Sequence, residues 1–136
     1  MYHVRNATLD DVRALLPYST EGGKVTLETV ETSDEIKVFL YNDKPLMILG
    51  LEYLPTGNQE IHAGLWGLFS REVDKHTKAL VRACKDLIFD RVGFSYAVLI
   101  DESNRKYSRF VEFFGFQRTE CVERIEEMLY RIYIKR

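Results

Sequence analysis

The segment Asn104–Phe116 reads Asn-Arg-Lys-Tyr-Ser-Arg-Phe-Val-Glu-Phe-Phe-Gly-Phe and decides the fold of this 136-residue chain. It follows Tyr96–Ile100, a continuous apolar run with the length of a buried strand. Asn104 is a residue type that caps the N-terminus of a helix, and Gly115 is the type that most often follows a helix. The segment therefore predicts a buried strand followed by a helix that begins at Asn104 and ends before Gly115.

Other apolar or alternating runs predict further strands. They are expected at Tyr2–Arg5, Ile36–Tyr41, Leu46–Leu54, Ile61–Phe69 and Met128–Ile134, and another extended segment is expected to begin at Phe116. The sequence Asn42-Asp43-Lys44-Pro45 supplies turn chemistry between two of these runs, so they should form a hairpin. Residues Pro55–Asn58 predict another turn.

Two more helices are expected. Thr8 followed by Asp10 and Asp11 is typical of a helix N-terminus, because a side-chain oxygen caps it and acids favour its dipole; Pro17 should bound this helix. A long amphipathic helix is predicted before Gly93, where apolar residues recur at helical spacing: Val73, Leu80, Val81, Cys84, Leu87 and Ile88. The polar stretch Ser19–Ser33 predicts a loop that can hold a short helix.

The order of these elements defines an α/β fold with a mixed sheet. The strand ending at Phe69 and the strand Tyr96–Ile100 should lie parallel and adjacent, because the helix between them supplies the right-handed crossover that such pairs require. At this length one domain over residues 1–136 is expected.

Composition and charge argue against three kinds of partner: nucleic acid, a membrane and a metal ion. There are 19 Lys and Arg against 21 Asp and Glu, a formal net charge of -2, so no nucleic-acid partner is expected. No apolar run approaches the roughly 20 residues of a membrane span. Cys84 and Cys121 match no metal-ligand spacing, which favours reduced thiols in a cytoplasmic protein without a metal site.

The Asn104 segment resembles the GNAT superfamily of N-acetyltransferases, whose corresponding segment reads roughly Asn-x-x-Ala-x-x-Leu-Tyr-x-x-x-Gly-Phe. The matching positions are Asn104, Phe110, Gly115 and Phe116. With the element order and the opening His3–Asp11, the resemblance covers nearly the whole chain. It implies a GNAT-like, mostly antiparallel twisted sheet of about six or seven strands flanked by three or four helices, with acetyl-CoA as cofactor and an amine as acceptor.

A narrower resemblance rests on Leu65–His76, on the basic helix after it and on the Asn104 segment. These residues look like those of small acetyltransferase-like proteins of short-tailed phages, including internal virion proteins. The resemblance implies virion proteins or a second copy of the chain as partners, and the host cytoplasm or the virion as location.

The sequence of the loop before the long helix departs from the superfamily pattern for binding acetyl-CoA. Superfamily members place an Arg/Gln-x-x-Gly-x-Gly/Ala loop there, whose glycines let backbone amides approach the pyrophosphate. With Leu80 aligned to the first helix leucine, Glu72, Lys75 and Thr77 stand at the motif positions, which predicts a degenerate site with weak or no activity. Alternatively, basic side chains here bind phosphate as point charges. The cofactor-binding candidates are Leu68, Phe69, Ser70, Arg71, Lys75, His76, Thr77, Lys78 and Asn104.

The resemblance also implies an acid and a base. Val111 occupies the position of the tyrosine that usually protonates the coenzyme A thiolate, and Tyr107 lies one turn earlier on the same face, so Tyr107 is the candidate acid. Glu52 is the candidate base, with Glu60 or His62 as alternatives. Two functions stay open: an N-acetyltransferase, or a structural or ejected virion component that uses the fold as an interaction surface.

Overall fold

The computed structural model describes residues 1–18, 27–54, 61–86, 94–125 and 127–136. Its strands are β1 Tyr2–Asn6, β2 Glu35–Tyr41, β3 Lys44–Tyr53, β4 Ala63–Phe69, β5 Tyr96–Asp101, β6 Gln117–Ile125 and β7 Met128–Lys135. Its α-helices are α1 Leu9–Leu15, α2 Leu27–Thr32, α3 Thr77–Cys84 and α4 Arg105–Phe113, with 3₁₀ helices at Leu16–Tyr18 and Val73–His76.

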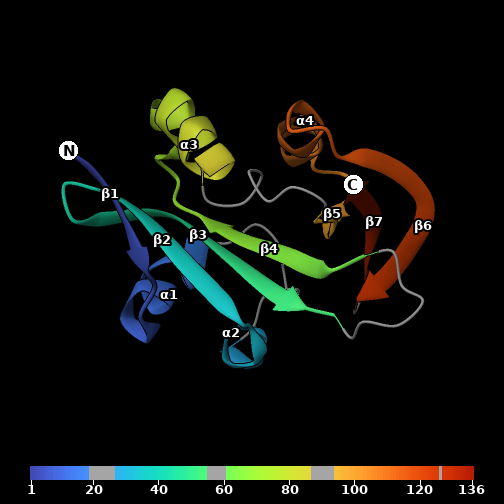
Figure 1. Cartoon of the computed structure of the whole chain (residues 1–136), viewed down its shortest axis with the longest axis horizontal. Coiled ribbons are helices and arrows are strands. Elements are labelled where there is room, and N and C mark those ends of the chain that lie inside the picture. Colours follow the sequence, from blue (N-terminus) through green and yellow to red (C-terminus); the bar gives the residue numbers. More distant parts are fainter. Residues whose placement is uncertain (19–26, 55–60, 87–93, 126) are drawn as a thin grey trace.

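All seven strands belong to one sheet, in the order β1-β2-β3-β4-β5-β7-β6. β4 and β5 are parallel, and each of the other neighbouring pairs is antiparallel. The predicted parallel pair is thus confirmed, and so is the α/β fold class with a mixed, mostly antiparallel sheet (Figure 1).

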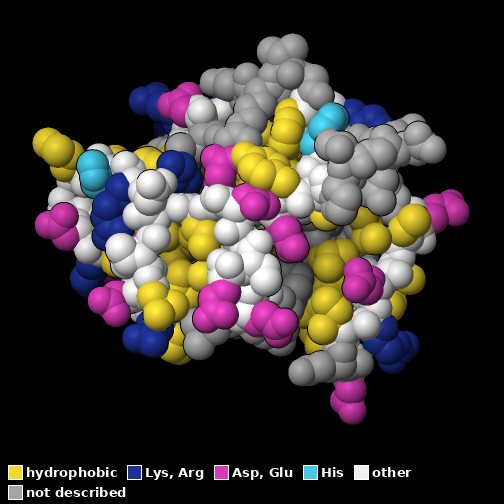
Figure 2. Space-filling model, turned by 60° about the horizontal axis from the view of Figure 1, so that its bottom comes forward, with side chains coloured by type: hydrophobic (Ala, Val, Ile, Leu, Met, Phe, Trp, Pro, Cys, Tyr) yellow, Lys and Arg dark blue, Asp and Glu magenta, His cyan; other side chains and the backbone are white. Residues whose placement is uncertain are grey.

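Helices cover both faces of the sheet. Figure 1 shows α3 and α4 on one side and α1 and α2 on the other. Because successive side chains of a strand point to opposite faces, each side has its own core: Trp66 and Leu68 of β4 pack with α1 and α2, whereas Ala63 and Phe69 of the same strand pack with α3 and α4. Figure 2 turns the lower side forward and shows acidic side chains gathered in the middle of that face.

Helix α4 begins and ends as its sequence predicts. The Asn104 side-chain oxygen accepts a hydrogen bond from the Tyr107 amide at 3.2 Å. At the other end Gly115 has φ 92°, its amide donates to the Glu112 carbonyl, and the Phe116 amide donates to the Val111 carbonyl. This pair of bonds is the Schellman motif, which satisfies the last carbonyls of the helix. The Asn…Gly-Phe pattern therefore specifies both ends of α4 through local contacts.

The helix after β4 differs from its prediction. Val73–His76 form a 3₁₀ turn, and α3 begins only at Thr77. His76 leaves the helical conformation with φ −126° and ψ 25°, and its Nδ1 lies 2.7 Å from the Tyr2 hydroxyl on β1. This contact with a distant strand favours the break between the 3₁₀ turn and α3. Leu87, Ile88 and Gly93 lie outside the described residues.

The hairpin of β2 and β3 turns in two residues rather than four. Asn42 and Asp43 have φ values of 48° and 66°, as this tight turn type requires, and Lys44 and Pro45 already belong to β3. Pro17 lies in a 3₁₀ turn after α1, and the short helix expected within 19–33 is α2. Residues 19–26, the predicted turn at 55–58 and Glu60 are outside the described residues. In the part of the chain that is described, no helix is long and apolar enough to cross a membrane.

Candidate functional site

The parallel strands β4 and β5 stay paired over only part of their length. The pairs are Ala63 with Tyr96, Gly64 with Ala97 and Leu65 with Val98. β4 continues to Phe69 and β5 to Asp101 without further pairing to each other, although each remains paired to its other neighbour. The two strands therefore diverge towards their carboxyl ends, where ligands bind in open α/β sheets.

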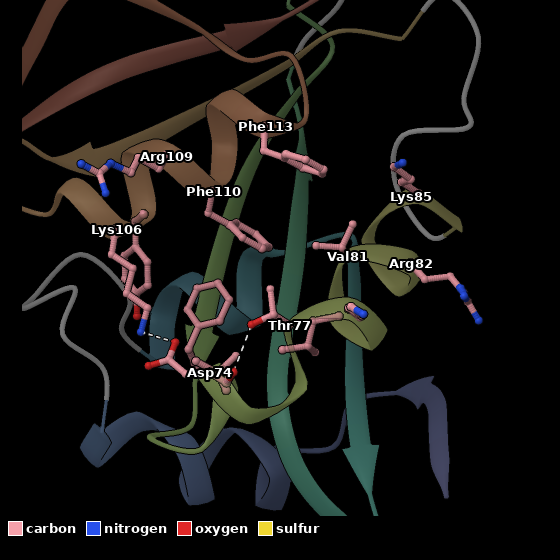
Figure 3. Close-up of a pocket in the computed structure, with 14 residues that line it drawn as sticks. Asp74, Thr77, Val81, Arg82, Lys85, Lys106, Arg109, Phe110 and Phe113 are labelled. Atoms are coloured by element: carbon pink, nitrogen blue, oxygen red, sulfur yellow. Dashed lines mark hydrogen bonds and ion pairs between the residues drawn. The ribbon is translucent and has the colours of Figure 1, made fainter.

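A cleft of about 710 Å³ lies beside this divergence, between α3 and α4 (Figure 3). Phe110 and Phe113 of α4 point into it from one side, and Thr77 and Val81 of α3 face them from the other. Phe69, at the end of β4, also lines it. The volume and the apolar walls are those of a small-molecule site.

The rim of this cleft is mostly basic. The charged side chains that line it are Asp74, Lys78, Arg82, Lys85, Lys106 and Arg109. Asp74 is the single acid among these described lining residues, and its carboxylate lies 2.5 Å from the Lys106 ammonium, joining the 3₁₀ turn to α4. Both side chains are more than half exposed, so the pair contributes little stability. It nevertheless lowers the positive charge at the end of the cleft where α3 begins.

The backbone of the 3₁₀ turn offers no glycine-type phosphate cradle. The Val73 amide donates to the Ser70 carbonyl at 3.2 Å, and the Lys75 amide donates to the Glu72 carbonyl at 3.0 Å. The Glu72 amide donates to the Ser70 hydroxyl at 3.1 Å. No described residue between 70 and 77 has the positive φ that anion-binding nests use. In addition, no side chain caps the N-terminus of α3, in contrast to α1 and α4.

Three of the predicted cofactor-binding residues line the cleft: Phe69, Thr77 and Lys78. Ser70, Arg71 and Lys75 do not, and Lys75 and Arg71 are exposed on the turn. Asn104 serves as the cap of α4. The structure therefore brings three of the predicted residues together at the cleft, whereas Ser70, Arg71, Lys75 and Asn104 do not line it.

Two further candidates point elsewhere. Leu68 is fully buried in the core beneath α1 and α2, on the opposite face of the sheet. His76 packs between Tyr2 and Tyr41, with ring centroids 5.5 and 4.7 Å away. Its imidazole therefore fastens the turn to β1 and β2 and does not line the cleft.

Tyr107, the candidate acid, lines the cleft. Its ring packs against Phe69 with centroids 4.9 Å apart. Val111, one turn later, is 7 % exposed and belongs to the core behind the cleft. The tyrosine that lines the cleft therefore lies one helical turn before the position at which the superfamily pattern has its tyrosine.

Glu52, the candidate base, lies in a second cavity of about 300 Å³. Thr29 of α2 and Trp66 of β4 also line it, which places it on the acidic face of Figure 2, across the sheet from the first cleft. Glu123 of β6 adds a second carboxylate. Tyr107 and Glu52 are therefore in different cavities on opposite faces.

Trp66 and His62 have structural roles. The Trp66 ring lies across Gly50, where an added Cβ would come within 2.0 Å of it, and its Nε1 donates to the Ser33 hydroxyl at 2.7 Å. His62 Nδ1 accepts from the Ser95 amide at 3.0 Å, and its ring stacks on Phe94. His62 thereby ties the start of β4 to the start of β5.

The cysteines suggest no thiol chemistry at the cleft. Both are free: Cys84 is buried in α3 and Cys121 is exposed. Burial raises the pKa of the Cys84 thiol to about 12, so it stays protonated at neutral pH. Among the described residues, no cluster of His, Cys, Asp and Glu could hold a metal ion.

Several cleft residues could not be identified from sequence. Val81, Arg82 and Lys85 of α3, and Lys106, Arg109 and Phe113 of α4, face one another only because two helices far apart in the chain share one side of the sheet. The recurrence of 106, 109, 110 and 113 at helical spacing was the available signal.

Comparisons with known proteins identify the fold. No protein-family model matches the sequence, and no curated protein matches it. The structure is similar to that of a probable acetyltransferase from Staphylococcus epidermidis, with a TM-score of 0.70, 13% identity, and coverage of 99% of this chain and 98% of that one. It is also similar to the ribosomal-protein-S18-alanine N-acetyltransferase from Escherichia coli, with a TM-score of 0.70, 13% identity, and coverage of 98% and 91%.

A third similar structure is the aminoglycoside acetyltransferase AAC(6')-Ib in complex with coenzyme A, with a TM-score of 0.65, 16% identity, and coverage of 99% of this chain and 94% of that one. The chain therefore has the GNAT acetyltransferase fold. At these identities the likeness establishes the fold and leaves the activity to be argued from the two cavities.

Proposed function

We propose that this chain is a weak acyl-CoA-dependent N-acyltransferase that holds the pantetheine arm of its donor in the cleft between α3 and α4. The observation that carries the proposal is the divergence of β4 and β5 after Leu65 and Val98, with the 710 Å³ cleft beside it. An apolar channel with a basic rim suits an arm that ends in phosphates. The complex of AAC(6')-Ib with coenzyme A supports acetyl-CoA as the donor.

The acceptor is proposed to approach from the other face. Glu52 and Glu123 line the second cavity, and Figure 2 shows acidic side chains gathered on the same side of the sheet, so a cationic amine is the favoured acceptor. Glu52 would take a proton from the ammonium through a water molecule. The amine nitrogen would then attack the thioester carbonyl carbon between the diverging strand ends. As the carbon–sulfur bond breaks, Tyr107 would give its proton to the departing thiolate. The nitrogen, which still carries one proton more than the amide product, would lose that proton to water, and the Tyr107 phenolate would regain a proton from water.

Weak donor binding follows from the turn before α3. Its Glu72, Val73 and Lys75 amides bond within the turn, and the Asp74 carboxylate stands beside them, so the pyrophosphate finds no backbone nest there. We expect a dissociation constant for acetyl-CoA above about 100 micromolar, which corresponds to less than roughly 5.5 kcal/mol of binding free energy.

Calorimetric titration with acetyl-CoA tests this expectation, with desulfo-coenzyme A as a non-reacting control. Low-micromolar affinity would contradict the proposed loss of the cradle. Transfer to a panel of di- and polyamines, measured by release of free thiol, tests the activity itself. Undetectable transfer at millimolar acetyl-CoA would refute the enzyme proposal.

A second candidate is a protein that has kept the fold as an interaction surface without transfer. The buried Val111 at the position of the usual acid favours it. The narrower prediction, a component of a phage virion, rests only on sequence patterns, namely Leu65–His76, the basic helix after it and the Asn104 segment, and stays a prediction. For this candidate, introducing a tyrosine by Val111→Tyr should not produce transfer, because the phosphate cradle is still absent.

A further inference from the structure

Lys106 is a lysine at the end of the cleft where the proposed donor brings its thioester. It directly precedes Tyr107 on α4, and both side chains line the cleft. The Tyr107 ring packs against Phe69 of β4, with ring centroids 4.9 Å apart, so this end of the cleft lies beside the diverging strands. A primary amine is therefore present on the same cleft wall as the proposed acid.

A carboxylate from the opposite wall contacts this amine. The Asp74 Oδ1 atom lies 2.5 Å from Lys106 Nζ, and Figure 3 shows this pair joining the 3₁₀ turn to α4. The turn is itself held by the Thr77 hydroxyl, which donates to the Asp74 carbonyl at 3.1 Å. A nucleophile and a base within hydrogen-bond reach of each other are the usual parts of a group that accepts an acyl group.

The other lysines of the cleft have different surroundings. Lys78 and Lys85 also line it, and the Lys85 ammonium lies 5.9 Å from the centroid of the Phe113 ring at the far end. Asp74 is the single acid among the described lining residues. Its carboxylate therefore distinguishes Lys106 from the other two lysines within the cleft.

We propose that Lys106 is a self-acylation site, to which the chain transfers the acyl group of its own bound donor, with Asp74 as the base. This inference rests on the proposed function, because the donor is the acyl-CoA held in the cleft. It differs in the acceptor. The Lys106 amine attacks from the donor's side of the sheet, whereas a free amine would approach through the cavity of Glu52 on the other face.

The reaction is the aminolysis of a thioester. The Lys106 ammonium gives one proton to Asp74, and the nitrogen lone pair forms a bond to the carbonyl carbon. The carbon–sulfur bond breaks, and the coenzyme A thiolate takes the Tyr107 proton, which water restores. The nitrogen loses its second proton to water, and Asp74 releases the proton that it took. The products are N-acetylated Lys106, free coenzyme A and one proton.

Asp74 has two opposing effects on this reaction, and their sizes decide which one prevails. Its charge stabilises the ammonium, which slows the attack, but the ion pair of two exposed side chains changes the rate by about fivefold at most. A positioned base accelerates a proton transfer by about 100-fold or more. Asp74→Asn should therefore lower the rate of Lys106 acylation by at least about 10-fold.

The test follows the acetylation of each lysine by peptide mass spectrometry, with isotope-labelled acetyl-CoA. Lys106 should be acetylated at least about 10-fold faster than Lys75, Lys78 and Lys85, because a bound donor replaces a chance collision. The rate should saturate with acetyl-CoA and be independent of the protein concentration. Acetyl phosphate is the control donor: it has no pantetheine arm to bind in the cleft, so it should show no preference for Lys106.

Two variants provide the second readout. Asp74→Asn should slow the labelling of Lys106 and leave the melting temperature unchanged, since the Asp74 side chain is more than half exposed. Glu52→Gln is the matched control, because it removes the proposed base of the other cavity. It should lower transfer to an added amine without slowing the labelling of Lys106.

Other results overturn the self-acylation site. Equal labelling of the other cleft lysines, a rate that does not saturate, or the same preference with acetyl phosphate would mean that no bound donor is involved. An undiminished rate in Asp74→Asn would remove Asp74 as the base. Transfer to an added amine without labelling of Lys106 would refute this inference and leave the proposed function intact. Labelling of Lys106 without transfer to any amine would refute the proposed function and support the site.

Discussion

Helix α4 and the junction leading into α3 form the two walls of one cleft, yet they relate to the acetyltransferase pattern in opposite ways. α4 keeps its Asn104 cap and its Gly115 stop, and both make the expected hydrogen bonds. The junction at residues 70–77 has none of the glycines, and its amides bond within a 3₁₀ turn.

The difference separates the local contacts that specify the fold from the backbone conformation that would bind the donor phosphates. Helix ends are specified by contacts within a few residues, so they persist as long as the fold does. A phosphate cradle is a backbone conformation that helps the ligand more than the fold. The chain can therefore lose its cradle and keep its sheet, its helices and its cleft.

The largest expected effect tests whether Tyr107 of α4 acts as the acid that protonates the departing thiolate. Tyr107→Phe should lower the turnover number for acetyl transfer by about 100-fold, the contribution of a positioned acid. Its ring would still pack on Phe69, so KM for acetyl-CoA and the melting temperature should change little. The measurement is the steady-state rate from pH 6 to 9.

Ser108→Ala is a suitable control, because Ser108 lies on the same helix, its hydroxyl donates to the Asn104 carbonyl at 3.2 Å, and it does not line the cleft. It should retain turnover. Equal loss of activity in both variants would mean that α4 itself is perturbed, and an unaffected Tyr107→Phe enzyme would remove Tyr107 as the acid.

Next in size is the loss of the α4 stop. Gly115→Ala should lower the free energy of unfolding by about 1–2 kcal/mol, because an L-residue is strained in the left-handed region. Gly115 has φ 92°, and an added Cβ would lie 3.2 Å from the Lys135 ammonium. Urea denaturation measures the change. Gly64→Ala, where nothing lies within 4 Å of the added Cβ, is the control; equal effects in the two would show that the φ value is not the cause.

A smaller effect is expected at α1, the other helix with a complete side-chain cap. Arg5 donates two hydrogen bonds to Asp11, which with the Thr8 bonds holds the pKa of this carboxyl below its ordinary value. Its stabilisation is therefore present above the unfolded-state pKa of about 3.9 and is lost as pH falls through the lower folded-state pKa. Asp11→Asn should cost about 1 kcal/mol at pH 7, the size of a helix cap.

The comparison of unfolding free energies at pH 7 and at pH 3 checks the sign. The difference between wild type and Asp11→Asn should shrink as pH falls, because the wild-type carboxyl becomes protonated. Asp10→Asn is the control, since the Asp10 side chain is almost fully exposed and its carboxylate lies no closer than 4.0 Å to the Arg13 guanidinium. A pH-independent difference for Asp11→Asn would mean that its charge contributes nothing.

These cases also explain which features the sequence predicts. Asn104, Gly115 and Thr8 act through neighbours three or four residues away, so their patterns predict helix ends correctly. The start of α3 could not be predicted, because His76 is turned by Tyr2, 74 residues away. The predicted strand pairing of β4 and β5 is right because connection handedness is a general rule.

Helix periodicity places some residues of the candidate site and cannot place the others, and the roles of these residues stay predictions. Tyr107 follows from the periodicity of a single helix, and it does line the cleft. Phe113 and Lys85 approach each other from helices on separate stretches of the chain, and no local pattern pairs them. Leu68 was expected near the cofactor, but strand alternation turns it to the other face.

The smallest expected effect concerns Asp74, the acid at the end of the cleft where α3 begins. Asp74→Asn should raise the affinity for acetyl-CoA by no more than about twofold at physiological ionic strength. If the basic rim holds the donor phosphates near Lys85, they lie about 12 Å along α3 from the Asp74 turn. This exceeds the Debye length of about 8 Å, so the carboxylate is largely screened from them. Titration of both proteins at low and physiological salt measures the change, and the gain should be larger at low salt.

Lys106→Met is the matched control: it leaves Asp74 without its ion-pair partner and should lower the affinity slightly. A gain of 10-fold or more for Asp74→Asn at physiological salt would place the pyrophosphate on the 3₁₀ turn, so that the junction would still bind phosphate and the contrast between the two walls would be wrong.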